Sequence, residues 1–188
     1  MFDLLNRYNK QGCLKFTIDD NLNRECEKAQ IPDDCCGVYI VYGYKNIYLQ
    51  EMKPDLSDFL EGGLFKKILA YGYFKGTKVP VYIGSSGHIE NGKTVHRKGG
   101  LKRRIIGKQQ KTPRWKLWPE KMRALSIFEL EICWYNTEND NPLLVEYCLI
   151  LESVIQNKRL PLWNSELKLS RELKGEFEDF VNNNNIEC

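Results

Sequence analysis

The feature that most constrains the fold is a set of three short strand-like segments separated by very unequal intervals. They occupy residues 37–42, 79–84 and 126–135 and are rich in β-branched and aromatic residues. In the last segment apolar and polar residues alternate, which is typical of a strand with one buried face. Because strands and helices do not alternate regularly, the sequence predicts an α/β protein of the α+β kind. We expect a small central, mostly antiparallel β-sheet flanked by helices.

Helical patterns surround these segments. The stretch 142–157 is strongly apolar at helical spacing, and Pro142 suits the first turn of a helix. We also expect helices at 22–30, 58–71, 100–110 and 170–181, an extended run at 46–52, a polar loop at 85–99, a turn at 160–164 and a frayed tail at 182–185. These elements divide the chain into an N-terminal extension (1–34), a central domain (35–166) and a C-terminal helix with a tail (167–188).

Composition places the chain among globular proteins. Of its 188 residues, 42% are hydrophobic and 28% are charged, which excludes a wholly disordered or low-complexity chain. No apolar run approaches the ~18 to 20 residues of a membrane span, and residues 1–10 lack the apolar core of a secretory signal. We therefore expect a cytoplasmic protein. Seven cysteines are an odd number, and no two have the two-residue spacing of a zinc knuckle, so we expect reduced, mostly buried thiols.

Charge is distributed very unevenly along the chain. Residues 93–123 hold twelve basic residues and one acid, a net charge of +11, whereas the whole chain carries only +3. The remainder is therefore net −8. Two tryptophans and two prolines lie inside the basic segment, so it is not a flexible basic tail. Such one-sided positive charge is typical of a protein that binds a polyanion, and it favours a nucleic-acid partner.

Two tripeptides are followed along the chain by three further motifs. Gly37-Val38-Tyr39 begins the first strand-like segment, and Tyr82-Ile83-Gly84 ends the second. They are followed by Leu101-Lys102-Arg103-Arg104 in a basic helix, Glu152 in the apolar helix, and the turn Pro161-Leu162-Trp163-Asn164. This set resembles the motifs of the GIY-YIG nuclease superfamily over about residues 37–164. The resemblance implies a GIY-YIG-like core with inserted loops and terminal extensions.

Three features depart from the family pattern. The gap between Tyr39 and Tyr82 is longer than in compact members, and a second insertion spans residues 85–100. Lys108 stands where many members have a histidine, four residues after the arginine. The inserted loops look like those of the type II restriction endonucleases of this superfamily.

The resemblance implies a catalytic role for six residues. Tyr39 and Tyr82 match the two active-site tyrosines, one of which positions or deprotonates the attacking water, and Lys108 is a third candidate for the base. Arg104 would grip the scissile phosphate with a planar fork of donors that a lysine cannot copy. Asn164 would fix the metal site or a tyrosine through hydrogen bonds. The full set is Tyr39, Tyr82, Arg104, Lys108, Glu152 and Asn164.

Glu152 is the predicted metal ligand. Its neighbours three and four positions away on the helix are mostly apolar, so its carboxylate needs a metal ion or a cationic partner such as Arg159. The resemblance implies Mg²⁺ (or Mn²⁺), and magnesium prefers hard oxygen ligands of this kind. Glu146 is the alternative ligand if the helix is aligned differently.

We expect double-stranded DNA as the partner. The predicted DNA-binding residues are Ser85, His96, Arg97, Lys98, Lys102, Arg103 and Lys111. The predicted function is a divalent-metal-dependent endonuclease that hydrolyses phosphodiester bonds in duplex DNA, most like a sequence-specific type II restriction enzyme. A palindromic recognition site would require a two-fold homodimer. The alternatives are a repair, structure-specific or mobile-element nuclease of the same superfamily, or a catalytically inactive nucleic-acid-binding module.

Overall fold

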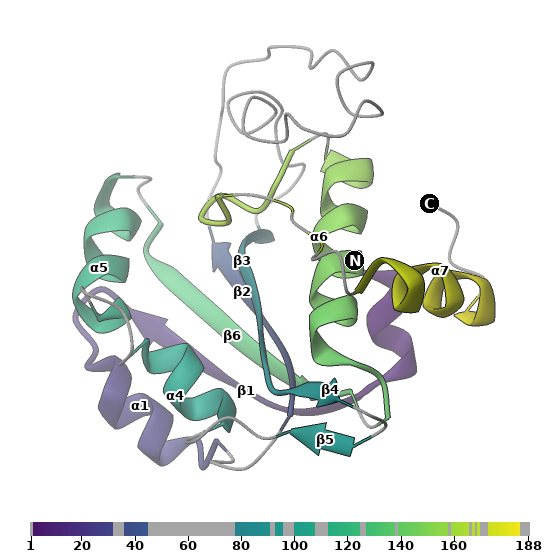
Figure 1. The fold of residues 1–188 in the computed structure, drawn as a ribbon. Coiled ribbons are helices and arrows are strands. Elements are labelled where there is room, and N and C mark those ends of the chain that lie inside the picture. The colour runs from purple at the N-terminus through teal and green to yellow at the C-terminus, as the bar shows by residue number, and fades with distance from the viewer. Residues whose placement is uncertain are drawn as a thin grey trace.

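A four-stranded antiparallel sheet forms the centre of the protein (Figure 1). The computed structural model describes residues 2–31, 36–44, 78–90, 93–95, 100–107, 113–124, 127–137, 139–157, 159–165, 167, 169 and 173–184. The strands are β1 (Asn9–Thr17), β2 (Gly37–Tyr44), β3 (Lys78–Ser86) and β6 (Glu129–Asn136), in the order β1-β6-β2-β3. With the five helices among the described residues, this sheet confirms the predicted small α+β fold.

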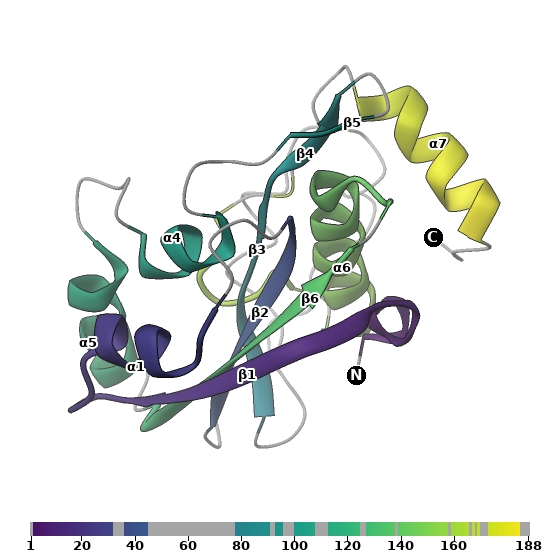
Figure 2. The same ribbon diagram turned by 90° about the horizontal axis from the view of Figure 1, so that it is seen from below.

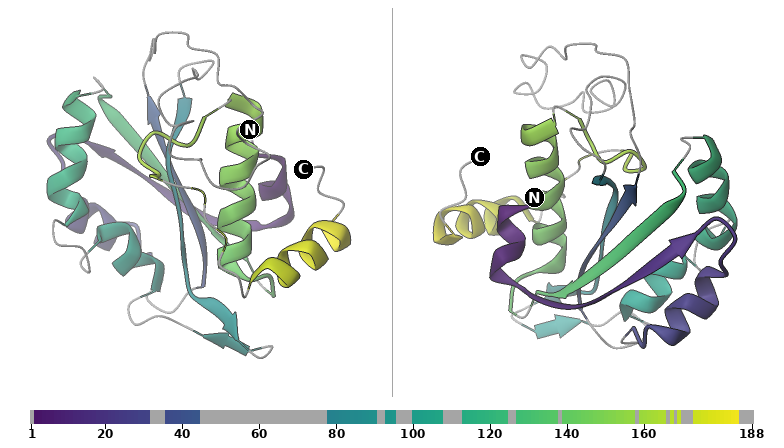
Figure 3. Two further views of the ribbon diagram at one scale, coloured as in Figure 1. Left: turned by 45° about the horizontal axis from the view of Figure 1, so that its top comes forward. Right: turned by 180° about the vertical axis from the view of Figure 1, so that it is seen from behind.

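Helices cover both faces of the sheet, so the molecule has three layers (Figure 2). On one face lie α1 (Leu22–Lys28), α4 (Gly100–Ile106) and α5 (Arg114–Ala124), which pack through apolar residues such as Leu22, Leu101 and Met122. On the other face lie the 3₁₀ helix η1 (Asp3–Arg7), α6 (Pro142–Asn157) and α7 (Leu173–Asn184) (Figure 3). Each face of the sheet therefore has its own hydrophobic core.

The N-terminal extension is an integral part of the sheet. The prediction for residues 1–34 included a helix at 22–30 but no strand. The structure confirms the helix as α1, and it adds β1, which pairs along its length with β6. In β1 only Leu14 and Phe16 are buried, and the first four residues are polar or glycine. This short alternation is too weak to predict a strand without its partner.

Two other segments differ from the predictions. Part of the predicted loop 85–99 is a hairpin of β4 (His88–Glu90) and β5 (Lys93–Val95), which continues from the end of β3 (Figure 2). Helix α5 was not predicted, because Pro119 lies inside it. The asparagine run predicted as a tail is helical as far as Asn184. The predicted run at 46–52 and helix at 58–71 lie outside the described residues.

Free thiols are found at Cys13, Cys26, Cys36, Cys133 and Cys148. Four of these are buried as expected, whereas Cys13 is exposed. No helix within the described ranges is both long and apolar enough to cross a membrane.

A buried carboxylate on β6 makes a testable contribution to stability. Glu131 is 9% exposed; its Oε2 accepts a hydrogen bond from the Tyr44 hydroxyl and lies 2.9 Å from Lys78 Nζ. Burial alone would raise the pKa of Glu131, but hydrogen bonds from Tyr44 and Lys78 outweigh burial and lower it to about 2. The folded state therefore gains stability from this carboxylate above its ordinary pKa of 4.5, and loses it as the pH falls towards 2.

We expect Glu131→Gln to lower the free energy of unfolding by about 1 to 3 kcal/mol at neutral pH, because Lys78 then loses its charged partner. Urea denaturation at several pH values measures the effect, and the difference from wild type should shrink between pH 4.5 and 2. Glu129→Gln is the control, since its pair with Lys15 is solvent-exposed and contributes little. Equal losses in both variants would contradict the prediction.

Candidate active site

The predicted catalytic residues that the structure describes gather, with one exception, around the outer edge of the sheet at β3. Helix α4 packs against this strand on one face and α6 packs against it on the other. Side chains from both helices therefore reach the end of β3, around Tyr82 to Ser85. This arrangement brings a guanidinium group, a carboxylate and two phenols into one region.

The two predicted tyrosines lie side by side on adjacent strands. Tyr39 on β2 and Tyr82 on β3 have ring centroids 5.9 Å apart. Tyr39 is fully buried, and burial raises the pKa of its phenol above the ordinary value of 10 although Arg114 acts in the opposite direction. Tyr82 is half-buried. Tyr39 is therefore held as a neutral phenol, and Tyr82 is the tyrosine within reach of solvent.

Gly84 is required by the position of Tyr39. The two residues are direct partners across the β2–β3 ladder, and the Tyr39 ring crosses over the glycine. A Cβ at Gly84 would lie 2.7 Å from the Tyr39 hydroxyl oxygen, far closer than ordinary contact. Gly84, which ends the tripeptide Tyr82-Ile83-Gly84, thus leaves room for the Tyr39 ring of the first tripeptide.

A buried arginine joins the two tyrosines. Arg114, the first residue of α5, is 3% exposed and donates hydrogen bonds from Nη1 to the Tyr39 hydroxyl and to the carbonyl oxygen of Arg104. Its Nη2 donates to the Tyr82 hydroxyl at 3.0 Å, and its Cζ lies 4.6 Å from the centre of the Tyr82 ring. One guanidinium group thereby fixes both phenols and the last turn of α4.

Sequence reasoning counted Arg114 only as one of twelve basic residues. No short motif marks it, because α5 was not predicted and its partners are ten, 32 and 75 positions away. The one local signal is Gly107, which ends α4 at a positive φ of 70°. A Cβ there would lie 2.6 Å from Arg114 Cγ, so this glycine makes room for the arginine.

Arg104 and Glu146 each form a hydrogen bond with Ser85. The Arg104 Nε donates to the Ser85 carbonyl oxygen at 3.0 Å, and the Ser85 hydroxyl donates to Glu146 Oε2. Arg104 and Glu146 are both half-buried, whereas Ser85 is 3% exposed. Ser85 was predicted to contact DNA. In the structure Ser85 is buried and its hydroxyl group holds Glu146 by a hydrogen bond.

Glu152 is the exception and lies away from this group. Its Oε1 accepts from the backbone N–H of Asp3 at 2.6 Å and from Gln156 Nε2 at 2.9 Å. Burial raises the pKa of this carboxyl group above its ordinary value, which favours the neutral form. Six positions separate Glu152 from Glu146, and the alignment of α6 turns Glu146 towards Ser85. The structure thus brings the alternative carboxylate, not the predicted one, to the end of β3, where the Ser85 carbonyl oxygen also accepts from Arg104.

Asn164 binds the outer edge of β3. Its Oδ1 accepts from Ile83 N and its Nδ2 donates to Ile83 O, both at 2.9 Å. One residue earlier, Trp163 N donates to Val81 O at 2.7 Å. Trp163 and Asn164 together therefore replace a neighbouring strand and hold the backbone on both sides of Tyr82. The amide of Asn164 bonds the backbone of Ile83 and not a tyrosine side chain.

The remaining predicted residues fall into two groups. Lys102 and Arg103 lie on α4 and are partly exposed. The other predicted residues lie outside the described residues: His96, Arg97, Lys98, Lys108 and Lys111.

The chemistry of Glu146 fits a hard divalent cation better than that of Glu152. A carboxylate beside a hydroxyl group supplies oxygen ligands, and magnesium commonly binds through one or two carboxylates together with substrate phosphate and water. The Glu152 carboxyl group already accepts hydrogen bonds from two donors, Asp3 N and Gln156 Nε2. If a magnesium ion binds here, Glu146 is the residue to hold it.

Comparison with protein-family models, with curated proteins and with solved structures finds no match to this chain.

Proposed function

We propose that the chain is a divalent-metal-dependent DNA endonuclease of the GIY-YIG type. The observation that carries this proposal is a hydrogen-bond network at the end of β3 that links Tyr39, Tyr82, Arg104 and Glu146 through Arg114 and Ser85. These residues come from β2, β3, α4 and α6, and three of them were predicted from the sequence motifs alone. Phosphodiester hydrolysis requires a positioned water, stabilisation of charge on the phosphate and support for the leaving oxygen, and a phenol, a guanidinium group and a metal-binding carboxylate can supply these.

Each side chain has a distinct task in the proposed reaction. Arg104 binds the scissile phosphate, because its planar donors match two phosphate oxygens and neutralise developing charge. Tyr82 orients the attacking water, since its hydroxyl group is fixed by Arg114 and its ring is partly exposed. Tyr39 stays a neutral phenol that packs beneath it, and Ser85 orients Glu146.

Glu146 would hold the metal ion in this scheme. When bound, the metal supplies charge stabilisation at the phosphate and support for the leaving oxygen. Arg104 and Glu146 share Ser85 as a neighbour, so the phosphate-binding group and the metal ligand are oriented by one residue.

The basic segment around α4 and α5 supports duplex DNA as the substrate. Lys102 and Arg103 lie on the same helix as Arg104 and are partly exposed. We expect Lys102→Gln to reduce the slope of log affinity against log salt by about 0.9 for the phosphate contact that is lost. Fluorescence anisotropy with a duplex at several salt concentrations measures this slope.

Lys15→Gln is the matched control for that experiment. Lys15 is an exposed lysine on β1, on the sheet face opposite to α4, and its variant should keep the wild-type slope. If Lys102→Gln also keeps that slope, this side of α4 does not meet DNA.

The decisive test of the proposed function is cleavage of plasmid and phage DNA in the presence of Mg²⁺ or Mn²⁺, followed by sequencing of the product ends. Fragments that share one motif would establish a sequence-specific restriction enzyme, and a palindromic motif would argue for a two-fold dimer. Random nicks would point to a repair, structure-specific or mobile-element nuclease. Salt-sensitive binding without cleavage under any divalent metal would mean that the chain is a binding module and not an enzyme.

A further inference from the structure

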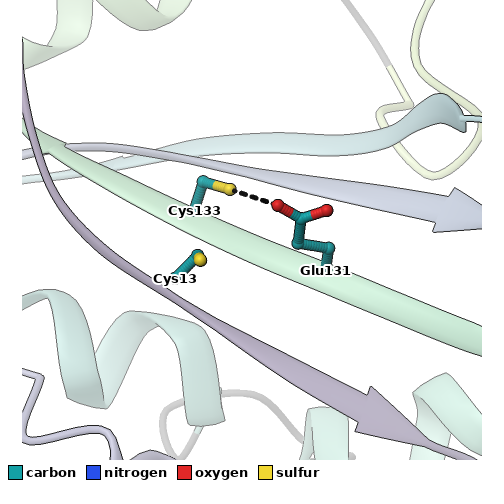
Figure 4. Close-up of side chains that lie close together, drawn as sticks. All are labelled: Cys13, Glu131 and Cys133. Atoms are coloured by element: carbon teal, nitrogen blue, oxygen red, sulfur yellow. Dashed lines mark hydrogen bonds between the residues drawn. The ribbon is translucent and has the colours of Figure 1, made fainter.

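A second cluster of metal-binding side chains lies at the opposite edge of the sheet, on β1 and β6. Cys13, Glu131 and Cys133 each direct a ligand atom to the same place, and these atoms all lie within 4.8 Å of one another (Figure 4). In the strand order β1-β6-β2-β3 this edge is the one farthest from β3. The cluster is therefore separate from the candidate active site and plays no part in the proposed hydrolysis.

The strand register explains why these side chains meet. Cys13 and Cys133 are direct partners across the β1–β6 ladder, so their side chains leave the sheet on the same face. Glu131 precedes Cys133 by two positions and shares that face because side chains alternate along a strand. A regular sheet thus holds all three groups in place, without any loop.

The carboxylate of Glu131 is oriented by residues on neighbouring strands. Its Oε2 accepts from the Tyr44 hydroxyl and lies 2.9 Å from Lys78 Nζ, whereas its Oε1 faces Cys133 Sγ at 3.3 Å. The two oxygens therefore have different partners. Hydrogen bonds to the outer oxygen of a metal-binding carboxylate are a common means of orienting it.

We propose that Cys13, Cys133 and Glu131 form a binding site for a borderline-soft divalent cation, of which Zn²⁺ is the best match. Two thiolates and a carboxylate oxygen are typical zinc ligands, with metal–ligand distances of about 2.0 to 2.3 Å. Ligand atoms around one tetrahedral ion lie about 3.5 to 4 Å apart, so side-chain rotation suffices to close the site. Magnesium does not suit this cluster, because it prefers oxygen ligands.

Charge and access also suit a bound cation. Zn²⁺ with two thiolates and a carboxylate carries a net charge of −1, which the positive charge of Lys10 beside the two sulfurs would offset. Cys133 and Glu131 are buried, whereas Cys13 is exposed and opens the site to solvent. Three protein ligands leave a fourth tetrahedral position for water or an external ligand.

The test is a titration of the reduced, metal-free full chain with Zn²⁺ in competition with a chromogenic chelator. Co²⁺ serves as the spectroscopic probe, because thiolate ligation produces a charge-transfer band in the near ultraviolet. We expect one equivalent of Zn²⁺ and a thiolate–Co²⁺ band. Cys13→Ser should weaken zinc binding by more than about tenfold and diminish the band, and because Cys13 is exposed this variant should fold normally.

Cys26→Ala is the control, because it removes a buried thiol from the core on the other face of the sheet and should leave zinc binding unchanged. Absence of zinc binding by the reduced protein would overturn the proposal. So would zinc binding that survives Cys13→Ser combined with Cys133→Ser, because the ion would then lie elsewhere. A stable Cys13–Cys133 disulfide in a protein that binds no zinc when reduced would identify a redox pair instead.

Discussion

Glu146→Gln is expected to lower metal-dependent DNA cleavage by about 10² to 10³ fold, whereas Glu152→Gln leaves it close to wild type. Glu146 accepts a hydrogen bond from Ser85, whose carbonyl oxygen binds Arg104, so its carboxylate belongs to the group around β3. Glu152 instead binds the N-terminal backbone at Asp3. Glutamine keeps the size of the side chain and removes only the charged metal ligand.

The two variants form a matched pair on one helix. Single-turnover cleavage at saturating DNA, repeated over a range of Mg²⁺ concentrations, compares them directly. Thermal unfolding should show that both remain folded. The opposite result, with Glu152→Gln inactive and Glu146→Gln active, would restore Glu152 as the metal ligand and would mean that α6 is aligned differently in the active protein.

Arg114→Lys is expected to reduce cleavage by about 10² fold or more, with little change in DNA affinity. Lysine keeps the positive charge, but its single ammonium group cannot donate to two tyrosine hydroxyls and the Arg104 carbonyl oxygen in the same planar geometry. The free energy of unfolding should fall by about 1 to 3 kcal/mol, because buried polar groups then lose hydrogen bonds.

Arg123→Lys is the control for this substitution, because Arg123 is exposed on the same helix. The cleavage rate at saturating DNA and the dissociation constant for the duplex are measured separately. A positioning role for Arg114 requires the rate to fall while the dissociation constant stays the same. If Arg114→Lys lowers stability but cleaves DNA at the wild-type rate, the arginine only supports the fold.

Much of the sheet could be predicted because its central strands carry their own pattern. Residues 37–42 and 126–135 combine β-branched and aromatic residues over a length typical of strands, and the structure has β2 and β6 there. β1 was missed because it is an outer strand with only two buried side chains, Leu14 and Phe16. Its position depends on pairing with β6, a contact between residues more than 100 positions apart.

The candidate site shows a similar division. Short motifs mark the two tyrosines, Arg104 and Asn164. In the structure Tyr39, Tyr82 and Arg104 lie around the end of β3, and the Asn164 amide binds the backbone of Ile83. The choice between Glu146 and Glu152 depends on the rotation of α6 about its axis, which the core on its own side of the sheet and the N-terminal segment determine. Arg114 begins a helix that the sequence did not predict, so no local pattern predicts its burial.

The amide of Asn164 has a consequence for how two copies of this chain could assemble. At Val81 and Ile83 the outward-facing backbone groups of β3 are occupied by Trp163 and Asn164, so a second molecule cannot extend the sheet there. Protection against edge-to-edge association is thus built into the strand that carries Tyr82. Two copies of the proposed nuclease could therefore not form a dimer by pairing their β3 edges at Val81 and Ile83.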